Sequence, residues 1–275
     1  MSYEQIKDLR PALFKRYCGV KPETFQRMVA AVSLHLAETR IKTGRPPKLS
    51  VEDQVLMTLE YWREYRTFFH IARSWGVHES SVWRTIRRVE DVLTKSKAFN
   101  LPGKKKLQMS DHEIELIVVD VTETPIERPK KKQKRYYSGK KKRHTLKSQV
   151  VVNGRTRQVI CTAHGHGPTH DFALYKQSKL ELHESLELLA DSGYQGLDKL
   201  HDKSRTPKKR TTKNQLTRDE KRVNRELSRR RIVVENVIRS LKIFRILLER
   251  YRNRRKRFSL RFNLIAGLYN FELSL

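Results

Sequence analysis

Two apolar runs of the sequence each end in an aspartate, and a third carboxylate lies inside a strongly helical segment. Asp120 follows the run Glu-Leu-Ile-Val-Val, Asp191 follows Leu-Leu-Ala, and Glu235 lies within residues 228–242. The chain carries 60 Lys and Arg against 30 Asp and Glu, so a carboxylate at the end of a buried strand requires an explanation. Ligands of open α/β sheets gather outside the carboxyl ends of strands. The pattern therefore predicts an α/β fold with a site at that edge.

The composition indicates a nucleic-acid partner. A chain of 275 residues can form one large domain or a small and a medium one. Its net charge of +30 favours binding to phosphates over binding to a membrane, for which no anchor is present. No apolar stretch of about 18 residues and no signal peptide is found, so we expect a cytoplasmic, nucleoid-associated protein. With only Cys18 and Cys161, a disulfide scaffold and a cysteine-based zinc finger are excluded.

The first 48 residues predict a helix followed by a basic linker. The helix is expected at 22–40, with Pro22 at its start. Two prolines keep residues 42–48 extended. The Gly-Arg-Pro within this linker resembles the core of an AT-hook, which lies in the minor groove, and makes Arg45 a candidate DNA contact. Such a short match favours a plain basic linker over an AT-hook.

Residues 49–100 predict an all-helical DNA-binding domain. Ser50 is a helix cap followed by an acidic turn. A short helix, a turn at Gly76 and a second helix after His78 resemble a helix-turn-helix, whose second helix enters the major groove. The alternative is an ordinary three-helix bundle with a solvated basic face. The side chains expected to face DNA are Ser80, Ser81, Arg84, Arg87 and Arg88.

Residues 108–275 predict an α/β domain, a mixed sheet flanked by helices. Strands are expected at 113–120, 147–152, 157–163 and 187–191, with an Asn-Gly hairpin turn at 153–154. Helices are expected at 171–182, over most of 217–249, and at 258–273. The last of these helices is apolar on most of its surface, so we expect it to be largely buried.

Asp120 and Asp191 are expected side by side at the ends of neighbouring strands, where two carboxylates repel unless a cation lies between them. Mg²⁺ prefers a few carboxylates together with water and phosphate oxygens. Two such ions, about 3.5–4 Å apart, can activate an attacking water or 3′-hydroxyl and stabilise the leaving oxygen of a phosphoryl transfer. The pattern thus indicates a metal site that acts on phosphodiesters.

Glu235 is the third expected ligand of this site. At about 100° per residue, Arg231, Glu235 and Lys242 lie within about 40° of one another on a helical wheel. One helix can therefore present a carboxylate flanked by two cations, both candidate DNA contacts. The alternative for Glu235 is an ordinary ion pair with Arg231 or Arg239, worth about 0.3–0.5 kcal/mol. The apolar stripe expected to pack on the sheet consists of Val233, Val237, Leu241 and Phe244.

Asp171 is a further carboxylate near the expected site. It begins a helix, where an aspartate is most often a cap, and its alternative role is that of an accessory metal ligand. His164, His166 and His170 allow a zinc site, but their glycine-rich spacing without a cysteine favours a place at the rim of the site.

A basic tract follows the strand that carries Asp120. Residues 128–147 contain eleven Lys or Arg and no acidic residue. This position favours a phosphate-tracking arm over a solvated loop, with Tyr136 and Tyr137 available to stack on an unpaired base. The cations assigned to DNA are Lys140, Lys141, Lys142 and Arg143.

Several motifs that occur in order resemble those of a known enzyme family. They are Val-Val-Asp-Val-Thr-Glu-Thr-Pro-Ile-Glu-Arg-Pro, Tyr-Tyr-Ser-Gly-Lys-Lys-Lys-Arg-His-Thr-Leu-Lys, Gly-Pro-Thr-His-Asp-Phe, Ala-Asp-Ser-Gly-Tyr-Gln-Gly and Arg-x3-Glu-x6-Lys. Over residues 45–275 the chain resembles IS5-type bacterial insertion-sequence transposases of the DDE superfamily, and it is similar to Harbinger transposases. The resemblance implies an RNase H-like catalytic domain, two Mg²⁺ or Mn²⁺ ions, and Asp120, Asp191 and Glu235 as catalytic metal ligands.

The resemblance also implies double-stranded DNA as partner, both the element ends and the target. It implies cleavage and strand transfer at terminal inverted repeats by a homo-oligomer assembled on DNA. One departure stands out, because Ser228 occupies the position of a tyrosine in the family signature. Two alternatives stay open, a DNA-binding protein that has lost its chemistry and an RNase H-like nuclease that cuts without joining.

Overall fold

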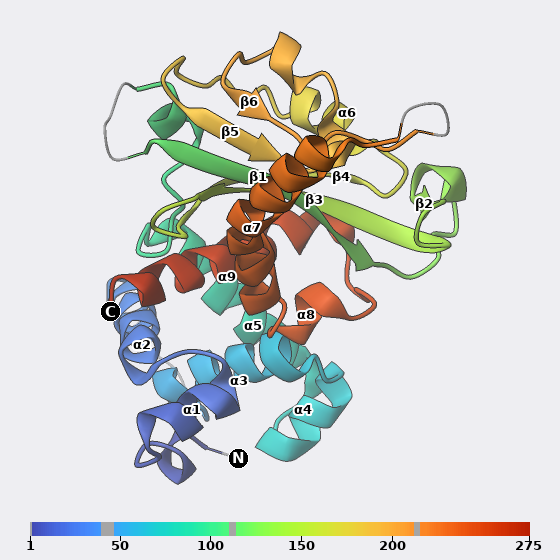
Figure 1. The fold of residues 1–275 in the computed structure, drawn as a ribbon. Coiled ribbons are helices and arrows are strands. Elements are labelled where there is room, and N and C mark those ends of the chain that lie inside the picture. The colour runs from blue at the N-terminus through green and yellow to red at the C-terminus, as the bar shows by residue number, and fades with distance from the viewer. Residues whose placement is uncertain (1, 40–46, 110–113, 212–214) are drawn as a thin grey trace. The chain divides into compact units, whose positions relative to one another are not determined.

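The computed structural model describes residues 2–39, 47–109, 114–211 and 215–275. The chain divides into two compact units, whose elements are labelled in Figure 1. The first unit comprises Met1–Asn100, Leu241–Glu249 and Asn253–Leu275, and the second comprises Leu101–Ser240 and Arg250–Arg252. Each unit has buried apolar side chains of its own.

The first unit is helical. α3 packs against α2 and α5, and α4 packs on α5. The fully buried side chains of Phe25, Trp62 and Ile86 belong to its core. The predicted helices at 22–40 and 258–273 are confirmed to within one residue. The helices are α1 (Pro11–Cys18), α2 (Pro22–Thr39), α3 (Val51–Glu64), α4 (Phe68–Trp75), α5 (Glu79–Lys95), α8 (Arg245–Leu248) and α9 (Phe258–Leu273).

Local signals set the ends of the helix-turn-helix. The Ser50 hydroxyl accepts the amide of Asp53 at 3.0 Å, as predicted for a cap of α3. Gly76 ends α4 with a φ of +59°, in the left-handed region that glycine adopts at little cost. His78 caps α5, because its Nδ1 accepts the amide of Ser80 at 3.2 Å. The turn and the second helix therefore occur where the sequence predicts them.

The C-terminal helix α9 belongs to the helical unit. The fully buried carboxylate of Glu90 on α5 accepts hydrogen bonds from Arg257 Nε at 2.9 Å and Arg261 Nε at 2.6 Å. The predicted domain boundaries, 1–48, 49–100 and 108–275, instead assign residues 241–249 and 253–275 to the α/β domain, so the structural division differs from them there. The apolar surface of α9 extends around the helix and does not indicate which core it joins.

The second unit is built on a mixed six-stranded sheet. The strand order is β2-β3-β1-β5-β6, and β4 pairs with β3. β3 is antiparallel to β1, β2 and β4, whereas β5 runs parallel to β1 and β6 parallel to β5. The predicted mixed sheet is confirmed. The strands are β1 (Leu116–Pro125), β2 (Tyr137–Ser138), β3 (Arg143–Asn153), β4 (Val159–His166), β5 (Glu187–Ala190) and β6 (Ser204–Arg205).

Three boundaries differ from the prediction. β1 continues to Pro125 because its residues after Asp120 keep pairing with β3, so Asp120 lies within the strand and not at its end. The loop after β3 is longer than a two-residue turn, since the amide of Asn153 bonds the carbonyl of Gln158 at 2.9 Å. The predicted helix at 171–182 ends early, as α6 (Asp171–Gln177), where a serine hydroxyl bonds a carbonyl of the last turn.

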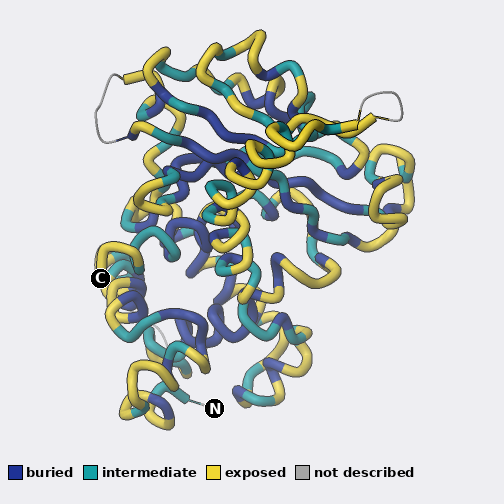
Figure 2. The backbone as a smooth tube through the Cα atoms, viewed as in Figure 1, coloured by how far each residue is buried: buried dark blue, intermediate teal, exposed yellow. Residues whose placement is uncertain are grey.

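The hydrophobic core of the second unit lies on one face of the sheet. One face carries a core cluster that includes Val119, Val151 and Tyr194, and α6 packs on β3 and β4. The strands of this core are buried, whereas much of α7 (Arg218–Leu241) is exposed (Figure 2). Successive side chains of a strand point to opposite faces, so Asp120 points away from the cluster that contains Val119. The buried stripe of α7 includes Val234, and not Val233 as predicted.

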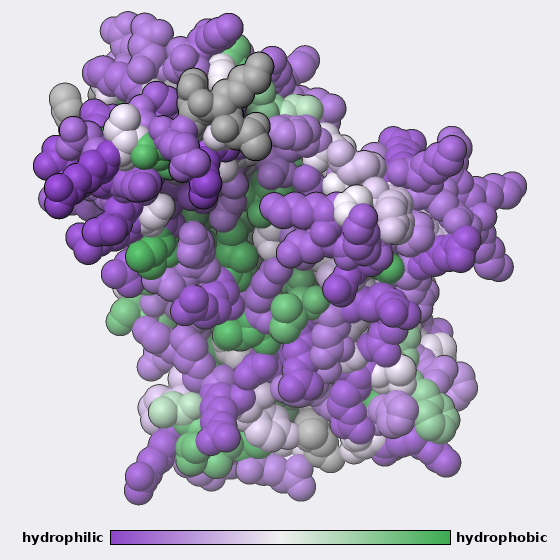
Figure 3. Space-filling model, turned by 45° about the vertical axis from the view of Figure 1, so that its right-hand side comes forward, coloured by the Kyte–Doolittle hydropathy of each residue, from purple (hydrophilic) through white to green (hydrophobic). Residues whose placement is uncertain are grey.

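Hydrophilic side chains cover most of the face drawn in Figure 3, as expected for a chain with 33% charged residues. Among the residues that the structure describes, none of the helices combines the length and the apolar character needed to span a membrane.

Candidate active site

The register of the sheet brings Asp120 and Asp191 to neighbouring positions. The parallel pairing of β1 with β5 ends with Val119 opposite Ala190, and the next residue of each segment is the aspartate. Both aspartates are half-buried. The carboxylates predicted from the ends of two apolar runs therefore follow paired residues of adjacent strands.

α7 adds Glu235 and Arg231 to the same region. The pKa of Asp120 is raised to about 6, chiefly by burial and in addition by the charges of Asp191 and Glu235, whereas the Val121 amide and Arg231 lower it. These groups therefore lie within electrostatic reach of Asp120. Glu235 is exposed, and no ion pair between it and Arg231 or Arg239 is found in the described part of the chain.

Backbone amides fix one oxygen of each aspartate. Asp120 Oδ1 accepts the amide of Val121 at 2.8 Å, and Asp191 Oδ1 accepts the amide of Gly193 at 2.6 Å. A Cβ atom at Gly193 would lie 2.8 Å from Asp191 Oδ1 and 3.3 Å from Asp171 Oδ2. Glycine at this position therefore lets the backbone approach two carboxylates at once.

Asp171 is held by a lysine from the sheet. Lys147 Nζ donates to Asp171 Oδ1 at 2.7 Å and to the carbonyl of Thr169 at 2.7 Å. The N-cap position of α6 belongs to His170, and Asp171 is the first helical residue, so the expectation that Asp171 is the cap is wrong. The Lys147 pair orients a further carboxylate toward Gly193 and Asp191.

Tyr194 is not among the predicted site residues, although it is fully buried beside them. Its pKa is raised by burial and by the charges of Asp120, Asp171 and Asp191. Its hydroxyl has no hydrogen-bond partner among the described residues. The signal in the sequence was its place in the Asp-Ser-Gly-Tyr turn directly after an apolar strand.

The carboxylates have the chemistry of a divalent-cation site. The second oxygens of Asp120 and Asp191 have no hydrogen bond to any described residue, and Mg²⁺ prefers such oxygens. Outside the gaps at 40–46, 110–113 and 212–214, no three His, Cys, Asp or Glu side chains are gathered tightly enough to hold one ion. The carboxylate oxygens match the preference of Mg²⁺ or Mn²⁺ by type, but the described residues do not form an assembled metal-binding cluster. His164 contacts Ser148 at 3.0 Å and Thr162 at 3.3 Å.

Two predicted features near Glu235 differ from the structure. α7 ends at Leu241, so Lys242 does not continue the helical register that was expected to place it beside Glu235, and it belongs to the first unit. Ser228, which replaces the tyrosine of the family signature, is exposed and donates to the carbonyl of Asn224 at 2.8 Å. Arg231 has a buried Nε without a hydrogen-bond partner among the described residues.

Comparison with known proteins identifies the family. A model described as "DDE superfamily endonuclease" matches residues 119–270, and one described as "Helix-turn-helix of DDE superfamily endonuclease" matches residues 47–97. A Microchaete diplosiphon protein named as a probable transposase for insertion sequence element IS702 is 51% identical over 275 residues, covering 100% of this chain and 99% of that protein. The chain belongs to the DDE superfamily of transposases.

A second relative agrees with this assignment. A Streptomyces albus G protein named as a transposase for insertion sequence element IS112 is 25% identical over 189 residues, 68% of either chain. No solved structure matches the transposase. The transposase thus has an α/β, RNase H-like catalytic domain preceded by a helix-turn-helix. The IS5 subtype and the similarity to Harbinger transposases stay predictions.

The basic arm of the transposase presents its cations to solvent. Lys140, Lys141, Lys142 and Arg143 are all exposed in and beside the turn between β2 and β3. The hydroxyl of Ser138 accepts the amide of Lys141 at 3.3 Å and shapes this turn. The position suits contact with a phosphate backbone.

The predicted DNA-facing residues of α5 occupy its solvent side. Ser80, Arg84 and Arg88 are exposed, and Ser81 and Arg87 are half-buried. Arg88 Nη2 donates to Gln54 Oε1 at 2.8 Å, which ties Arg88 to α3. Trp83, not among the predicted contacts, is 45% exposed. Arg45 lies outside the described residues.

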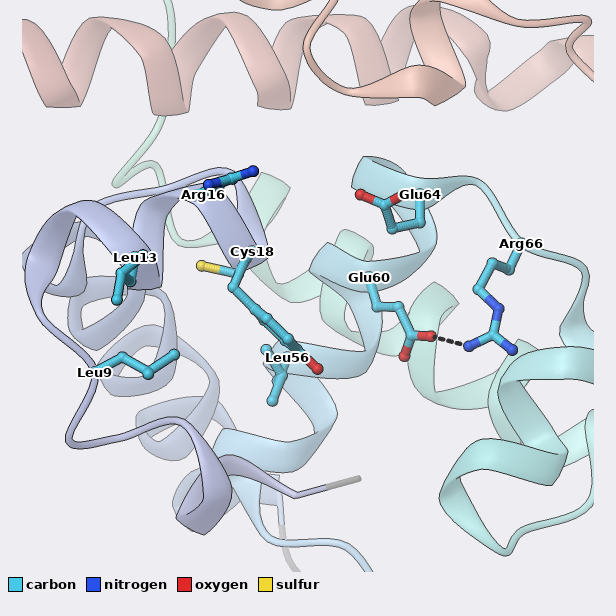
Figure 4. A pocket seen from close by; sticks show the side chains of 9 residues that line it. Leu9, Leu13, Arg16, Cys18, Leu56, Glu60, Glu64 and Arg66 are labelled. Atoms are coloured by element: carbon cyan, nitrogen blue, oxygen red, sulfur yellow. Dashed lines mark hydrogen bonds and ion pairs between the residues drawn. The ribbon is translucent and has the colours of Figure 1, made fainter.

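The helical unit of the transposase contains a pocket whose lining differs from that of the carboxylate site (Figure 4). Its lining includes the apolar side chains of Leu9, Leu13 and Leu56 together with Glu60 and Arg66. Glu60 and Arg66 bond each other at 3.0 Å. Glu60 and Arg66 thus bind each other within the pocket lining, and the pocket contains none of the predicted site residues.

Proposed function

We propose that this transposase cleaves DNA at the terminal inverted repeats of its element and joins the ends to a target, using Asp120, Asp191 and Glu235 with two Mg²⁺ or Mn²⁺ ions. The observation that supports the proposal is that Asp120 and Asp191 directly follow paired residues of β1 and β5, with Glu235 of α7 within electrostatic reach of Asp120. Enzymes of the DDE superfamily typically use divalent metal ions. A buried carboxylate with two carboxylate neighbours and no ion pair is suited to such an ion.

Each residue of the site has a proposed task. Asp120 and Asp191 hold the metal ions through the oxygens that their amide hydrogen bonds leave open, and Glu235 completes the donor set. When bound, the ions activate the attacking hydroxyl and stabilise the leaving oxygen. The guanidinium of Arg231, on the same helix as Glu235, is the proposed donor to a phosphate oxygen. Asp171, oriented by Lys147, is the proposed accessory ligand.

The remaining cations are proposed to guide double-stranded DNA. The N-terminal part of α5 contacts base edges, and the exposed turn between β2 and β3 contacts phosphates. Joining both ends of one element to a target suggests a homo-oligomer on DNA, associated with the nucleoid. The proposed DNA contacts are Arg45, Ser80, Ser81, Arg84, Arg87, Arg88, Lys140, Lys141, Lys142, Arg143, Arg231 and Lys242.

The test is a cleavage assay on labelled duplexes that carry the ends of the element. Wild type is compared with Asp191→Ala and with Asp198→Ala, an exposed aspartate in the same segment that serves as a matched control. We expect Mg²⁺-dependent cutting at the ends by wild type and Asp198→Ala, and none by Asp191→Ala, with equal DNA affinity in all three. A supercoiled plasmid in the same reaction reports joining.

The other outcomes separate the alternatives. Cutting without joined products, with any target supplied, indicates a nuclease. Sequence-specific binding without cutting in Mg²⁺ or Mn²⁺ indicates a DNA-binding protein that has lost its chemistry. Cutting by Asp191→Ala at the wild-type rate contradicts the assignment of the site.

A further inference from the structure

One of the three tryptophans of the chain differs from the other two. The indole N–H groups of Trp62 and Trp75 donate to the buried carboxylates of Glu90 at 3.1 Å and Glu60 at 2.6 Å. Trp83 is 45% exposed, and its indole has no hydrogen bond to a described residue. Of the three tryptophans, Trp83 is therefore the one whose ring and N–H group are both available to a binding partner.

Trp83 lies on the solvent face of α5 together with polar residues. At about 100° per residue, Ser80, Trp83, Arg84 and Arg87 span about 100° of the helix surface. Val82, Ile86 and Val89 are buried on the opposite side. The face containing Trp83 is therefore the one that a helix-turn-helix turns toward the major groove.

An arginine fixes the environment of the Trp83 ring. The guanidinium carbon of Arg87 lies 4.8 Å from the ring centroid, within the range of a cation–π contact. Arg84 Nη2 is held in turn by the Ser80 hydroxyl at 3.1 Å. These contacts limit the rotamers of both arginines before DNA binds, which lowers the entropy lost on binding.

We propose that Trp83 and Arg87 form a base-reading pair, in which the Trp83 ring contacts the 5-methyl group of a thymine and Arg87 donates to a neighbouring guanine. This inference rests on the proposed DNA-binding function of α5. Thymine is the base that presents a methyl group in the major groove, and arginine pairs best with guanine O6 and N7. The arginines around the ring complement a polyanion, which favours DNA over a protein surface as the occupant.

The experiment removes the methyl group from the DNA. The full-length protein first selects its preferred sequence from random duplexes, and each thymine of that sequence is then replaced in turn by deoxyuridine. We expect wild type to lose about fourfold in affinity at one or two thymines, the effect of one buried methyl group. Trp83→Ala should bind thymine and deoxyuridine duplexes equally at those positions.

Phe69→Ala is the matched control. Phe69 is also exposed, at 53%, and lies 5.8 Å from the guanidinium of Arg73, but it belongs to α4. This variant should keep the deoxyuridine penalty of wild type. Melting curves check that both variants fold, as expected for changes at exposed positions.

Three results overturn the inference in distinguishable ways. If Trp83→Ala shows the same deoxyuridine penalties as wild type, Trp83 does not read thymine. If Trp83→Ala changes self-association and leaves the deoxyuridine scan unchanged, the ring serves a second copy of the chain. If wild type selects no sequence at all, the proposed DNA recognition by α5 fails, and the inference fails with it.

Discussion

Glu90 of the helical unit and two aspartates of the α/β unit, Asp120 and Asp191, have contrasting surroundings. In the helical unit, Glu90 is fully buried and accepts hydrogen bonds from Arg257, Arg261 and the indole of Trp62. In the α/β unit, Asp120 and Asp191 accept one backbone amide each and form no ion pair with any described residue. Cations are abundant in a chain with net charge +30, so their absence from these two aspartates is informative.

This difference in surroundings distinguishes a carboxylate that stabilises the fold, Glu90, from the aspartates that are proposed to act in catalysis. A buried carboxylate is costly unless it is paired and hydrogen-bonded, which is how Glu90 holds α5 to the C-terminal segment. Asp120 of the α/β unit bears that cost, as its raised pKa indicates. Uncompensated charge at one point of a stable fold is typical of sites that bind a ligand.

The largest expected effect on stability is the loss of Glu90. Glu90→Ala leaves the guanidinium of Arg261, itself 3% exposed, without its carboxylate and should lower the free energy of unfolding by about 3–5 kcal/mol. Urea unfolding of the helical signal measures this. Glu79→Ala, an exposed position on the same helix, is the control and should change stability by less than about 1 kcal/mol. A loss at Glu90 as small as at Glu79 contradicts the structural assignment.

Gly193→Ala tests the geometry of the α/β unit. The added methyl group lies 2.8 Å from Asp191 Oδ1, so the carboxylate must move. Since a displacement of about 1 Å can cost a factor of about 100, cleavage should fall about 100-fold while DNA affinity is unchanged. Single-turnover cleavage and a binding titration measure the two quantities. Wild-type cleavage in this variant would mean that the position of Asp191 does not matter.

Asp120→Asn should stabilise the metal-free protein. The folded state raises the pKa of Asp120 from 3.8 to about 6, so the folded protein binds this proton more tightly than the unfolded chain. The contribution of Asp120 to the stability of the folded wild type is therefore fully present below about pH 4 and is lost as the pH rises through about 6. The asparagine variant avoids this loss and should be more stable at pH 7 by on the order of 2 kcal/mol, with little difference at pH 4.

Glu187, a carboxylate of the α/β unit that forms an ion pair, is expected to affect stability in the opposite direction when its charge is removed. Hydrogen bonds from Arg230 lower the pKa of Glu187, so its charge stabilises the folded state. Glu187→Gln should therefore destabilise the protein at pH 7. Thermal melting of both variants in EDTA, at pH 4 and at pH 7, measures these changes in stability. If Asp120→Asn destabilised the protein at pH 7, the expected difference between Asp120 and Glu187 would be contradicted.

The sequence predicted most elements because their signals are local. The Ser50 cap, the Gly76 turn and the apolar strand before Asp191 each depend on a few neighbouring residues. The neighbouring places of Asp120 and Asp191 followed from strand ends and sheet edges alone, although Asp120 is interior to its strand. Periodicity also located α7, including the position of Glu235 on it.

The features that the sequence did not predict depend on distant contacts. β1 extends past Asp120 because β3 continues to pair with it, and α9 joins the helical unit through Glu90. The pairing of Asp171 with Lys147 joins residues from β3 and α6. Trp83 was not among the residues predicted to face DNA, although its helical position beside Ser80 and Arg84 indicates the solvent face, where it is 45% exposed.

The central claim is that the carboxylates without cation partners carry the chemistry. Single-turnover cleavage of the element ends by Asp120→Asn, measured together with DNA affinity, tests it most directly. Removing a metal ligand costs several kcal/mol of transition-state stabilisation, so cleavage should fall by at least about a thousandfold. DNA affinity should stay equal or rise, because a charge that repels phosphate is removed. Cleavage at the wild-type rate would contradict the account.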